Sequence, residues 1–414
     1  MTELVIDRLG TQGDGIADTA DGPFYIARTL PGERVEVEDD PDQPSRPQLK
    51  RILEPSDNRV AAPCKHYKRC GGCQLQHMSP ALQEEFKTGI VTDALTREGF
   101  GAVALRPLIT VPMHSRRRMS LRVMRSGKQI IIGLNAARSD QVVDLAVCEI
   151  AEPMIVNALP AWRELFQTLF GRRGHAALVL TVTVNGLDAA MVMNREASLE
   201  DRERLTKFAY DYGIARISWN DEVITAPHDA HQQFGPALIA PPSGGFLQAA
   251  KTGEEALVTA VLEAVGDASV VADMFCGAGT FTMPMAKNSH VTAFESDEEA
   301  VRALQVGADR AAGIGKCNPV KAQRRDLFRR PLLPTEVKTF DAIVFDPPRA
   351  GAKAQVEELA QTAVPRLVGV SCNPVSFARD AAILRSGGYH LDWVQPVDQF
   401  RHSAHVELVG QFTK

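Results

Sequence analysis

The sequence contains no apolar run long enough to cross a bilayer, so we expect no membrane-spanning helix. Its first residues, MTELVIDRLG, also lack the basic start, apolar middle and small-residue cleavage site of a secretory signal. We therefore expect a cytoplasmic protein that makes no contact with a membrane.

An excess of positive charge is also absent. The chain has 46 Lys and Arg against 51 Asp and Glu, a formal net charge of −5, so no overall basic field indicates nucleic-acid binding. A local basic patch can still bind phosphates, because phosphate contacts are local. Five arginines gather in one strand-like stretch, and we expect some of them to form a phosphate track, with a solvated strand face as the alternative. They are Arg116, Arg117, Arg118, Arg122 and Arg125.

Cysteine is sparse, and its arrangement does not indicate a disulfide framework. The chain has seven cysteines, and cytoplasmic thiols are normally kept reduced. Cys64, Cys70 and Cys73 form a C-x5-C-G-G-C pattern, and Cys148 stands alone downstream. Three close thiols and one distant thiol predict a single metal centre. Four sulfurs fit either tetrahedral zinc or an iron–sulfur cluster, and the spacing alone does not choose between them.

A chain of 414 residues is too long for one ordinary domain, and its patterning changes twice. Residues 1–54 have short apolar runs broken by Gly and Pro turns, which predicts a small β-barrel. Residues 55–240 mix strand-like and helical runs, which predicts a central α+β domain. Residues 241–414 alternate apolar strands with amphipathic helices, which predicts a doubly wound, Rossmann-like α/β domain with a parallel sheet.

The first strand of this third domain, SVVADMF, runs into the loop FCGAGT over residues 275–280. Ligands of open α/β sheets bind past the carboxyl ends of strands, and glycines let the backbone approach them closely. The next strand ends at Glu295, whose carboxylate could bond both hydroxyls of a ribose. The glycines are two apart with no third, unlike a dinucleotide loop. The loop therefore favours S-adenosylmethionine over NAD or over a turn that binds nothing.

Two further strands end on the same rim in residues that suit chemistry. FDAIVF ends in Asp346 and the residues PPR, and RLVGV ends in Ser371 and Cys372. A thiol at the carboxyl end of a buried parallel strand is placed for nucleophilic reaction. A base should lie nearby, and Glu407 in the segment HSAHVE is the candidate. His402 and His405 of this segment are the alternatives, because histidine titrates near neutral pH.

Four motifs taken together, DMFCGAGTF, DPPRAG, SCNP and HSAHVE, resemble the RNA 5-methyluridine methyltransferase family over nearly the whole chain. The resemblance implies that Cys372 is the nucleophile, that Glu407 is the general base and that Asp346 lines the site. The departures are small, since many members have Asn where Thr280 and Asp326 stand here. They affect the detail of the cofactor contacts and not the reaction.

The resemblance also implies S-adenosylmethionine as cofactor. The residues expected to line its site are Gln248, Phe275, Gly277, Thr280, Glu295, Asp326 and Asp346.

The implied chemistry explains why a thiol is required. Carbon 5 of uracil is a poor nucleophile toward a methyl sulfonium. Addition of the Cys372 thiolate to carbon 6 makes an enolate, and carbon 5 then becomes nucleophilic. After methylation, a base removes the proton on carbon 5 so that the thiolate can leave. To reach the thiol, the uridine must leave its stack.

In the same family the C-x5-C-G-G-C pattern with a distant Cys holds a [4Fe–4S] cluster, which implies that Cys64, Cys70, Cys73 and Cys148 are its ligands. We expect the cluster to have a structural or RNA-shaping role rather than a redox one. Residues 1–54 resemble the TRAM module, which is linked with RNA binding. Members with both features resemble enzymes that act on large-subunit rRNA, so we expect 23S rRNA as the substrate. We also expect a monomer. The alternatives are a tRNA uridine-C5 methyltransferase and a non-enzymatic RNA-binding module, which would not explain Cys372 with Glu407.

Overall fold

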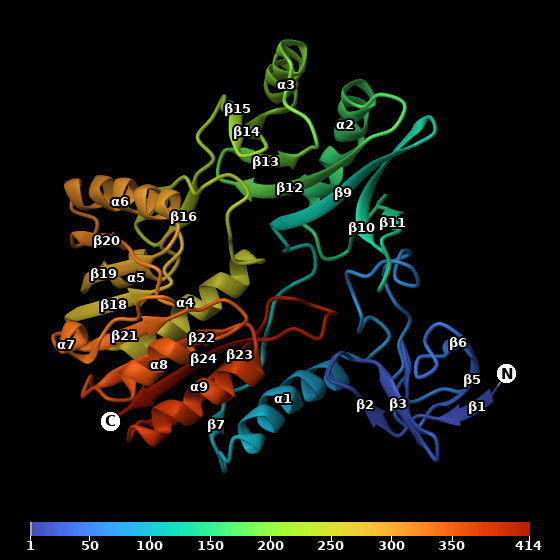
Figure 1. Cartoon of the computed structure of the whole chain (residues 1–414), viewed down its shortest axis with the longest axis horizontal. Coiled ribbons are helices and arrows are strands. Elements are labelled where there is room, and N and C mark those ends of the chain that lie inside the picture. Colours follow the sequence, from blue (N-terminus) through green and yellow to red (C-terminus); the bar gives the residue numbers. More distant parts are fainter. Residues whose placement is uncertain (1) are drawn as a thin grey trace.

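The computed structural model describes residues 2–414, and its largest element is a nine-stranded sheet near the C-terminus (Figure 1). The strand order is β20-β19-β18-β21-β22-β24-β23-β7, with β8 also paired to β23. Five strands, β18 to β22, run parallel, and β24 is antiparallel to both of its neighbours. The bounds are β7 (Ala104–Leu105), β8 (Ile109–Thr110), β18 (Val270–Met274), β19 (His290–Glu295), β20 (Val320–Arg324), β21 (Ala342–Phe345), β22 (Arg366–Ser371), β23 (His390–Asp398) and β24 (Glu407–Thr413).

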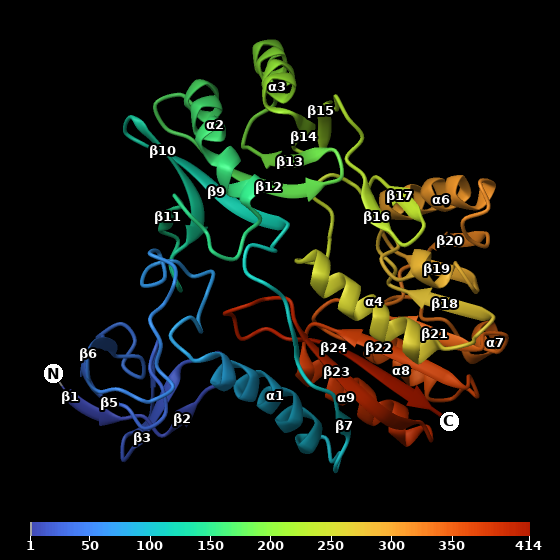
Figure 2. The same cartoon turned by 180° about the vertical axis from the view of Figure 1, so that it is seen from behind.

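Helices cover both faces of this sheet, because its central strands are apolar on both sides. Along β21, Val344 packs into the core on one face, whereas Ile343 and Phe345 pack into the core on the other. One face carries α4 (Lys251–Val265), α5 (Thr282–Met285) and α6 (Glu298–Gly313). The opposite face carries α1 (Pro80–Arg97), α8 (Lys353–Leu359) and α9 (Pro374–Ser386), with the short α7 (Pro334–Val337) nearby. Figure 2 shows α4 lying across the strands. The predicted doubly wound α/β fold is confirmed.

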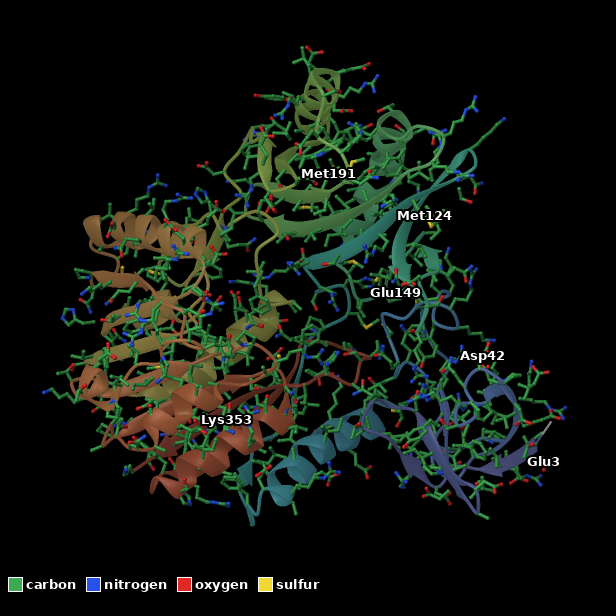
Figure 3. The ribbon with its side chains drawn as sticks, in the orientation of Figure 1. Glu3, Asp42, Met124, Glu149, Met191 and Lys353 are labelled. Atoms are coloured by element: carbon green, nitrogen blue, oxygen red, sulfur yellow. The ribbon has the colours of Figure 1, made fainter. Side chains whose placement is uncertain are left out.

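The middle of the chain forms a seven-stranded sheet in the order β11-β10-β9-β12-β13-β14-β15. Helices α2 (Pro153–Leu169) and α3 (Leu199–Tyr212) pack on it around the fully buried Trp162. Figure 3 labels Met124 on β9 and Met191 on β13 in this sheet. The bounds are β9 (Arg118–Ser126), β10 (Gln129–Asn135), β11 (Val142–Asp144), β12 (His175–Thr183), β13 (Gly186–Val192), β14 (Ile214–Trp219) and β15 (Glu222–Thr225).

The N-terminal segment forms two three-stranded sheets, β1-β5-β6 and β2-β3-β4, around a small apolar core that includes Ile6, Ile26 and Val35. The bounds are β1 (Thr2–Val5), β2 (Arg8–Leu9), β3 (Gly15–Thr19), β4 (Gly22–Ile26), β5 (Arg34–Glu38) and β6 (Gln48–Glu54). No helix of the described residues is long and apolar enough to cross a membrane.

The domain limits expected from the sequence differ from the packing at two places. Helix α1 and strands β7 and β8 fall within the expected central domain, yet they pack on the C-terminal sheet. The hairpin β16 (Gln232–Phe234) and β17 (Ala237–Ile239) packs against α6 of the same body. Short strands and a lone helix carry no sequence signal for which sheet they join, so periodicity could not assign them.

A buried ion pair ties α1 to the C-terminal sheet. Lys87 is fully buried on α1, and its ammonium contacts the carboxylate of Asp398 at the end of β23. The same ammonium donates to the carbonyl oxygen of Phe400 at 3.3 Å. Burial disfavours the charged form of both side chains, and the attraction between them offsets part of this cost. Removing one partner leaves the other charge buried and unpaired.

We expect Lys87→Met to lower the free energy of unfolding by about 3–5 kcal/mol, because Asp398 then stays buried without a partner. Denaturant unfolding followed by circular dichroism measures this. The double variant Lys87→Met/Asp398→Asn should recover part of the loss, since no charge remains buried there. Equal stability of Lys87→Met and the unchanged protein would show that the pair contributes nothing.

Candidate active site

The pairing of β22 with β24 sets the geometry between the predicted nucleophile and the predicted base. Ser371 lies opposite Leu408 at the end of this antiparallel pair, and Cys372 and Glu407 are the next residues of the two segments, so they lie beside each other. Burial and the charge of Glu407 both act on the Cys372 thiol, which agrees with this placement. The thiol and the carboxyl group, which are 35 positions apart in the sequence, therefore face one space.

That space is a cavity of about 780 Å³ at the carboxyl ends of the parallel strands. Every predicted catalytic and cofactor residue lines it: Gln248, Phe275, Gly277, Thr280, Glu295, Asp326, Asp346, Cys372 and Glu407. The structure thus brings together side chains from the carboxyl ends of five parallel strands, from the start of β24 and from the segment that enters α4. Their individual roles stay predictions.

The loop after β18 has the backbone shape that its glycines allow. Phe275 and Gly277 both have positive φ, at 62° and 53°. The N–H of Gly277 donates to Glu295 at 3.0 Å, and the other carboxylate oxygen of Glu295 accepts from Ser296 N–H at 2.6 Å. These bonds fix the Glu295 carboxylate at the rim of the cavity. Phe328 packs on Phe275, with ring centroids 5.4 Å apart.

This end of the cavity suits S-adenosylmethionine in the chemistry of its walls. The aromatic rings of Phe275 and Phe328 offer an apolar surface for a base, and the carboxylates of Glu295 and Asp326 are acceptors for hydroxyl groups. Asp326 is held by Phe328 N–H, which donates to it at 3.0 Å.

Burial shifts the ionisation of the groups at the other end. It raises the pKa of Glu407 to about 7, while a hydrogen bond from Gln399 and the charge of Arg349 oppose the rise. Burial, together with repulsion from Glu407, raises the pKa of Asp346 to about 8. Burial raises the pKa of the Cys372 thiol to about 11, and repulsion from the carboxylates of Glu407 and Asp346 adds to the rise. A carboxyl group that titrates near 7 can accept a proton at neutral pH.

The two histidines considered as alternative bases differ in position. His405 lines the cavity, and its Nδ1 lies 3.1 Å from the guanidinium of Arg349. His402 does not line it and instead contacts Gln83 on α1 at 3.1 Å. Burial lowers the pKa of both, to about 4 for His402, which makes each a weaker base at neutral pH. Glu407 therefore stays the predicted base.

The cysteine-rich loop borders the same cavity, although its sequence lies far from the catalytic motifs. Gly71, Gly72 and Gln74 are part of the cavity wall. The N–H groups of Gln74 and Leu75 both donate to the carbonyl oxygen of His402, at 2.7 and 2.9 Å. This loop therefore supports the backbone that leads into Glu407.

The four cysteines of the predicted metal centre gather in one place. Cys73 feels the charges of Cys64, Cys70 and Cys148, and burial raises the pKa of its thiol to about 12. Figure 3 places Glu149, the neighbour of Cys148, between the central sheet and the N-terminal sheets. Within residues 2–414, no three His, Cys, Asp or Glu side chains form a site for a single metal ion. The metal centre stays a prediction.

The arginine stretch divides between two environments. Arg117 is buried and donates to the carbonyl oxygen of Gln248 at 3.0 Å and to Glu254, so it is a structural tie and not a phosphate contact. Arg118 lines the cavity but donates to the carbonyl oxygen of Gly244 at 2.9 Å. Arg116 lines the cavity with its guanidinium over the ring of Phe400. Of these three, Arg116 and Arg118 line the cavity and Arg117 does not.

Two residues of the site were missed from the sequence. Gln399 is buried, donates to Gln248 and lies near enough to Glu407 to lower the pKa of its carboxyl group. Phe246 is 72% exposed at the cavity wall. An exposed phenylalanine beside a predicted cofactor residue could have been noticed, whereas a lone glutamine after a strand gives no signal.

Comparison with known proteins shows the family of the chain. Residues 241–413 match the family model described as tRNA (Uracil-5-)-methyltransferase. A Brucella suis protein named as an RNA methyltransferase is 40% identical, over 100% of this chain and 98% of its own length. The 23S rRNA (uracil(1939)-C(5))-methyltransferase RlmD of Halomonas elongata is 30% identical, over 98% of this chain and 88% of its own. The chain belongs to the RNA uracil-C5 methyltransferase family.

A solved structure supports the fold of this methyltransferase. The Pyrococcus abyssi tRNA (uracil-54, C5)-methyltransferase, in complex with S-adenosyl-L-homocysteine, superposes with a TM-score of 0.76 at 24% identity, and the match covers 99% of each chain. The likeness therefore extends over the N-terminal, central and C-terminal parts together.

Because the carboxylate of Glu407 raises the pKa of the Cys372 thiol, Glu407→Gln should increase the thiolate fraction. We expect Cys372 to react with iodoacetamide about three- to tenfold faster at pH 8 in this variant, since the thiolate is the reactive form. Peptide mass spectrometry follows each cysteine separately. Cys317, which is outside the cavity, is the internal control and should react at an unchanged rate. An unchanged rate at Cys372 would contradict the electrostatic coupling.

Proposed function

We propose that this RNA methyltransferase transfers a methyl group from S-adenosylmethionine to carbon 5 of a uridine in 23S rRNA, with Cys372 as nucleophile and Glu407 as general base. The observation that carries the proposal is the β22–β24 register, which sets this thiol beside this carboxyl group. Both side chains line the cavity, and the loop after β18 forms another part of its wall. A structural thiol would need neither the carboxyl group nor the shared cavity.

The residues of the cavity divide the reaction between them. The Cys372 thiolate forms a bond to carbon 6, and the electron pair of the 5,6 double bond moves into the enolate. S-adenosylmethionine, when bound, supplies the methyl group that carbon 5 takes. Glu407 then accepts the proton from carbon 5, the double bond re-forms, and the bond between carbon 6 and sulfur breaks to return the thiolate.

The charges around Cys372 bear on when it becomes reactive. Arg349 lowers the pKa of the thiol, opposing the two carboxylates that raise it. Because the thiolate is the nucleophile, Arg349 favours the reactive form. Glu407, with a pKa of about 7, is ionised in a large fraction at neutral pH and can receive the proton that carbon 5 loses.

For the cofactor, we assign the wall of the cavity to the residues expected from the sequence. The rim carboxylates Glu295 and Asp326 would take the hydroxyl groups, and Phe275 would contact the base. Gly277 and Thr280 would let the loop backbone approach the cofactor closely. Gln248 and Asp346 would lie toward the end of the cavity where Cys372 and Glu407 stand. All of them line the one cavity.

For the cysteines, we propose a [4Fe–4S] cluster held by Cys64, Cys70, Cys73 and Cys148. Support comes from the four thiols lying close enough to influence one another's ionisation. Burial disfavours four bare thiolates, whereas bound iron would stabilise them. The cluster would stiffen the loop that bonds His402, a structural contribution to the catalytic segment.

The choice of 23S rRNA is supported by the Halomonas relative, whose name specifies that substrate and whose match spans 98% of this chain. A tRNA is the second candidate, because the matching family model is named for tRNA. The N-terminal sheets would add a TRAM-like RNA-binding surface. The proposal includes work in the cytoplasm, where rRNA is modified, and action as a monomer.

The mechanism predicts different results for two variants. Cys372→Ala should abolish methyl transfer and form no adduct. Glu407→Gln should still add to the uracil and methylate it, but it should release product about a hundred- to ten-thousand-fold more slowly, because the base is missing. A denaturing gel should then show protein joined to methylated RNA. Transcripts of 23S rRNA and of tRNA, supplied separately, show which class is trapped.

The double variant Cys372→Ala/Glu407→Gln is the control and should show no shifted band. Full turnover by Glu407→Gln without a trapped species would remove Glu407 from the base role. A band formed with tRNA and not with 23S rRNA would replace the proposed substrate while keeping the chemistry.

Protein purified without oxygen should be brown, contain iron and sulfide, and absorb broadly near about 400 nm. Cys64→Ser and Cys148→Ser should lose the colour, because each would remove one cluster ligand. Cys317→Ser is the matched control and should keep it, since Cys317 packs on the core of the C-terminal sheet, whereas Cys70 and Cys148 pack on that of the central sheet. A colourless protein that holds one zinc ion per chain would overturn the cluster.

A further inference from the structure

Gln399 occupies a fully enclosed position directly after β23, and its side chain touches both functional ends of the cavity. Only 3% of it is exposed. Its Nε2 donates to the Oε1 of Gln248 at 2.5 Å, and its Oε1 accepts from the N–H of Ala249 at 3.0 Å. The same side chain lies near the carboxyl group of Glu407 and opposes the rise of its pKa. One amide thus bonds a residue assigned to the cofactor side and lies near the residue assigned as base.

The direction of these bonds is fixed by the backbone. The N–H of Ala249 can only donate, so the oxygen of the Gln399 amide must face it and the nitrogen must face Gln248. Gln248 then has to present its oxygen to Gln399. Its own Nε2 is left to face the cavity that Gln248 lines. The cavity therefore receives a hydrogen-bond donor at this point, and not an acceptor.

Neighbouring elements leave Gln399 no other place. A Cβ added at Gly253 on α4 would lie 2.7 Å from the Cβ of Gln399, which is closer than such atoms approach. The residues on either side, Asp398 and Phe400, are both held by the Lys87 ammonium. Packing from α1 and α4 therefore fixes the orientation of the Gln399 amide. Because this amide is already ordered, substrate binding costs no further side-chain entropy here.

We propose that Gln399 is a positioning residue that fixes the amide of Gln248 and the carboxylate of Glu407 in one relative arrangement. The Gln248 amide nitrogen, which is the donor on the cofactor side, and the general base are then held in place by the same side chain. The inference rests on the proposed function of Glu407. It adds a residue that touches neither substrate nor cofactor and that acts through two residues that do.

The ionisation of Glu407 gives a readout that a purely structural glutamine would not move. The groups that face Glu407 are Asp346 at the end of β21, Cys372 at the end of β22, Arg349 in the loop after β21, and Gln399. Of these, Arg349 and Gln399 hold the pKa of Glu407 down against burial. Loss of the Gln399 amide should raise that pKa, so less carboxylate is present at a given pH below it and activity moves to higher pH.

The test compares Gln399→Met with Gln355→Met. Gln355 is an equally buried glutamine on α8 whose amide bonds Leu332 at 2.8 and 3.1 Å, away from the cavity. For Gln399→Met we expect the acid limb of the kcat–pH profile to move up by about half to one pH unit. We also expect the Kd for S-adenosylmethionine, measured by calorimetry on the purified full chain, to rise about two- to tenfold. Gln355→Met should change neither value.

Gln399→Glu is the second variant, with the same side-chain size, in case Met disturbs folding. It removes the donors and adds an acid beside Glu407, so the acid limb should move up at least as far. A wild-type pH profile and Kd in a folded Gln399 variant would overturn the inference. If Glu407→Gln still traps the RNA adduct, that result leaves the proposed function intact, whereas full turnover by Glu407→Gln would overturn the proposed function itself.

Discussion

The site depends on the insertion of one antiparallel strand, β24, between β22 and β23. Strands β22 and β24 run in opposite directions, so the first residues of β24 lie beside the last residues of β22. The other parallel strands end at this same edge of the sheet. Glu407 is the first residue of β24, and Cys372 follows the last residue of β22. A parallel neighbour would have placed its first residue at the opposite edge of the sheet, far from the thiol.

This placement concentrates ionisable groups where water is scarce. Asp346, Cys372 and Glu407 stand on neighbouring strand ends, and burial raises the pKa of all three. Bringing the acids together costs folding free energy, because like charges and desolvation both oppose ionisation. The raised pKa of Glu407 is useful for catalysis, since a carboxyl group with a pKa of about 7 can gain and lose a proton under cellular conditions.

Support for these groups comes from parts of the chain that carry no catalytic motif. The cysteine-rich loop bonds the carbonyl oxygen of His402, and Lys87 on α1 contacts Asp398 at the end of β23. Gln399 lies between these two supports. The segment from Asp398 to Glu407 is thus held by residues from the N-terminal half of the chain.

The sequence by itself determined the local features. The alternation of apolar strands with helices predicted the α/β fold, and the glycines after β18 predicted the loop at the cavity. Motif chemistry selected Cys372 and Glu407. These signals are readable because each depends on neighbours a few positions away: side-chain period, turn residues and strand ends. The tertiary structure alone decided the rest. It paired Lys87 with a residue 311 positions away, turned Arg117 from an expected phosphate contact into a tie to Glu254, and enclosed Gln399 between two functional residues. A long-range partner leaves no periodic trace in the sequence, because its identity depends on which elements meet in space.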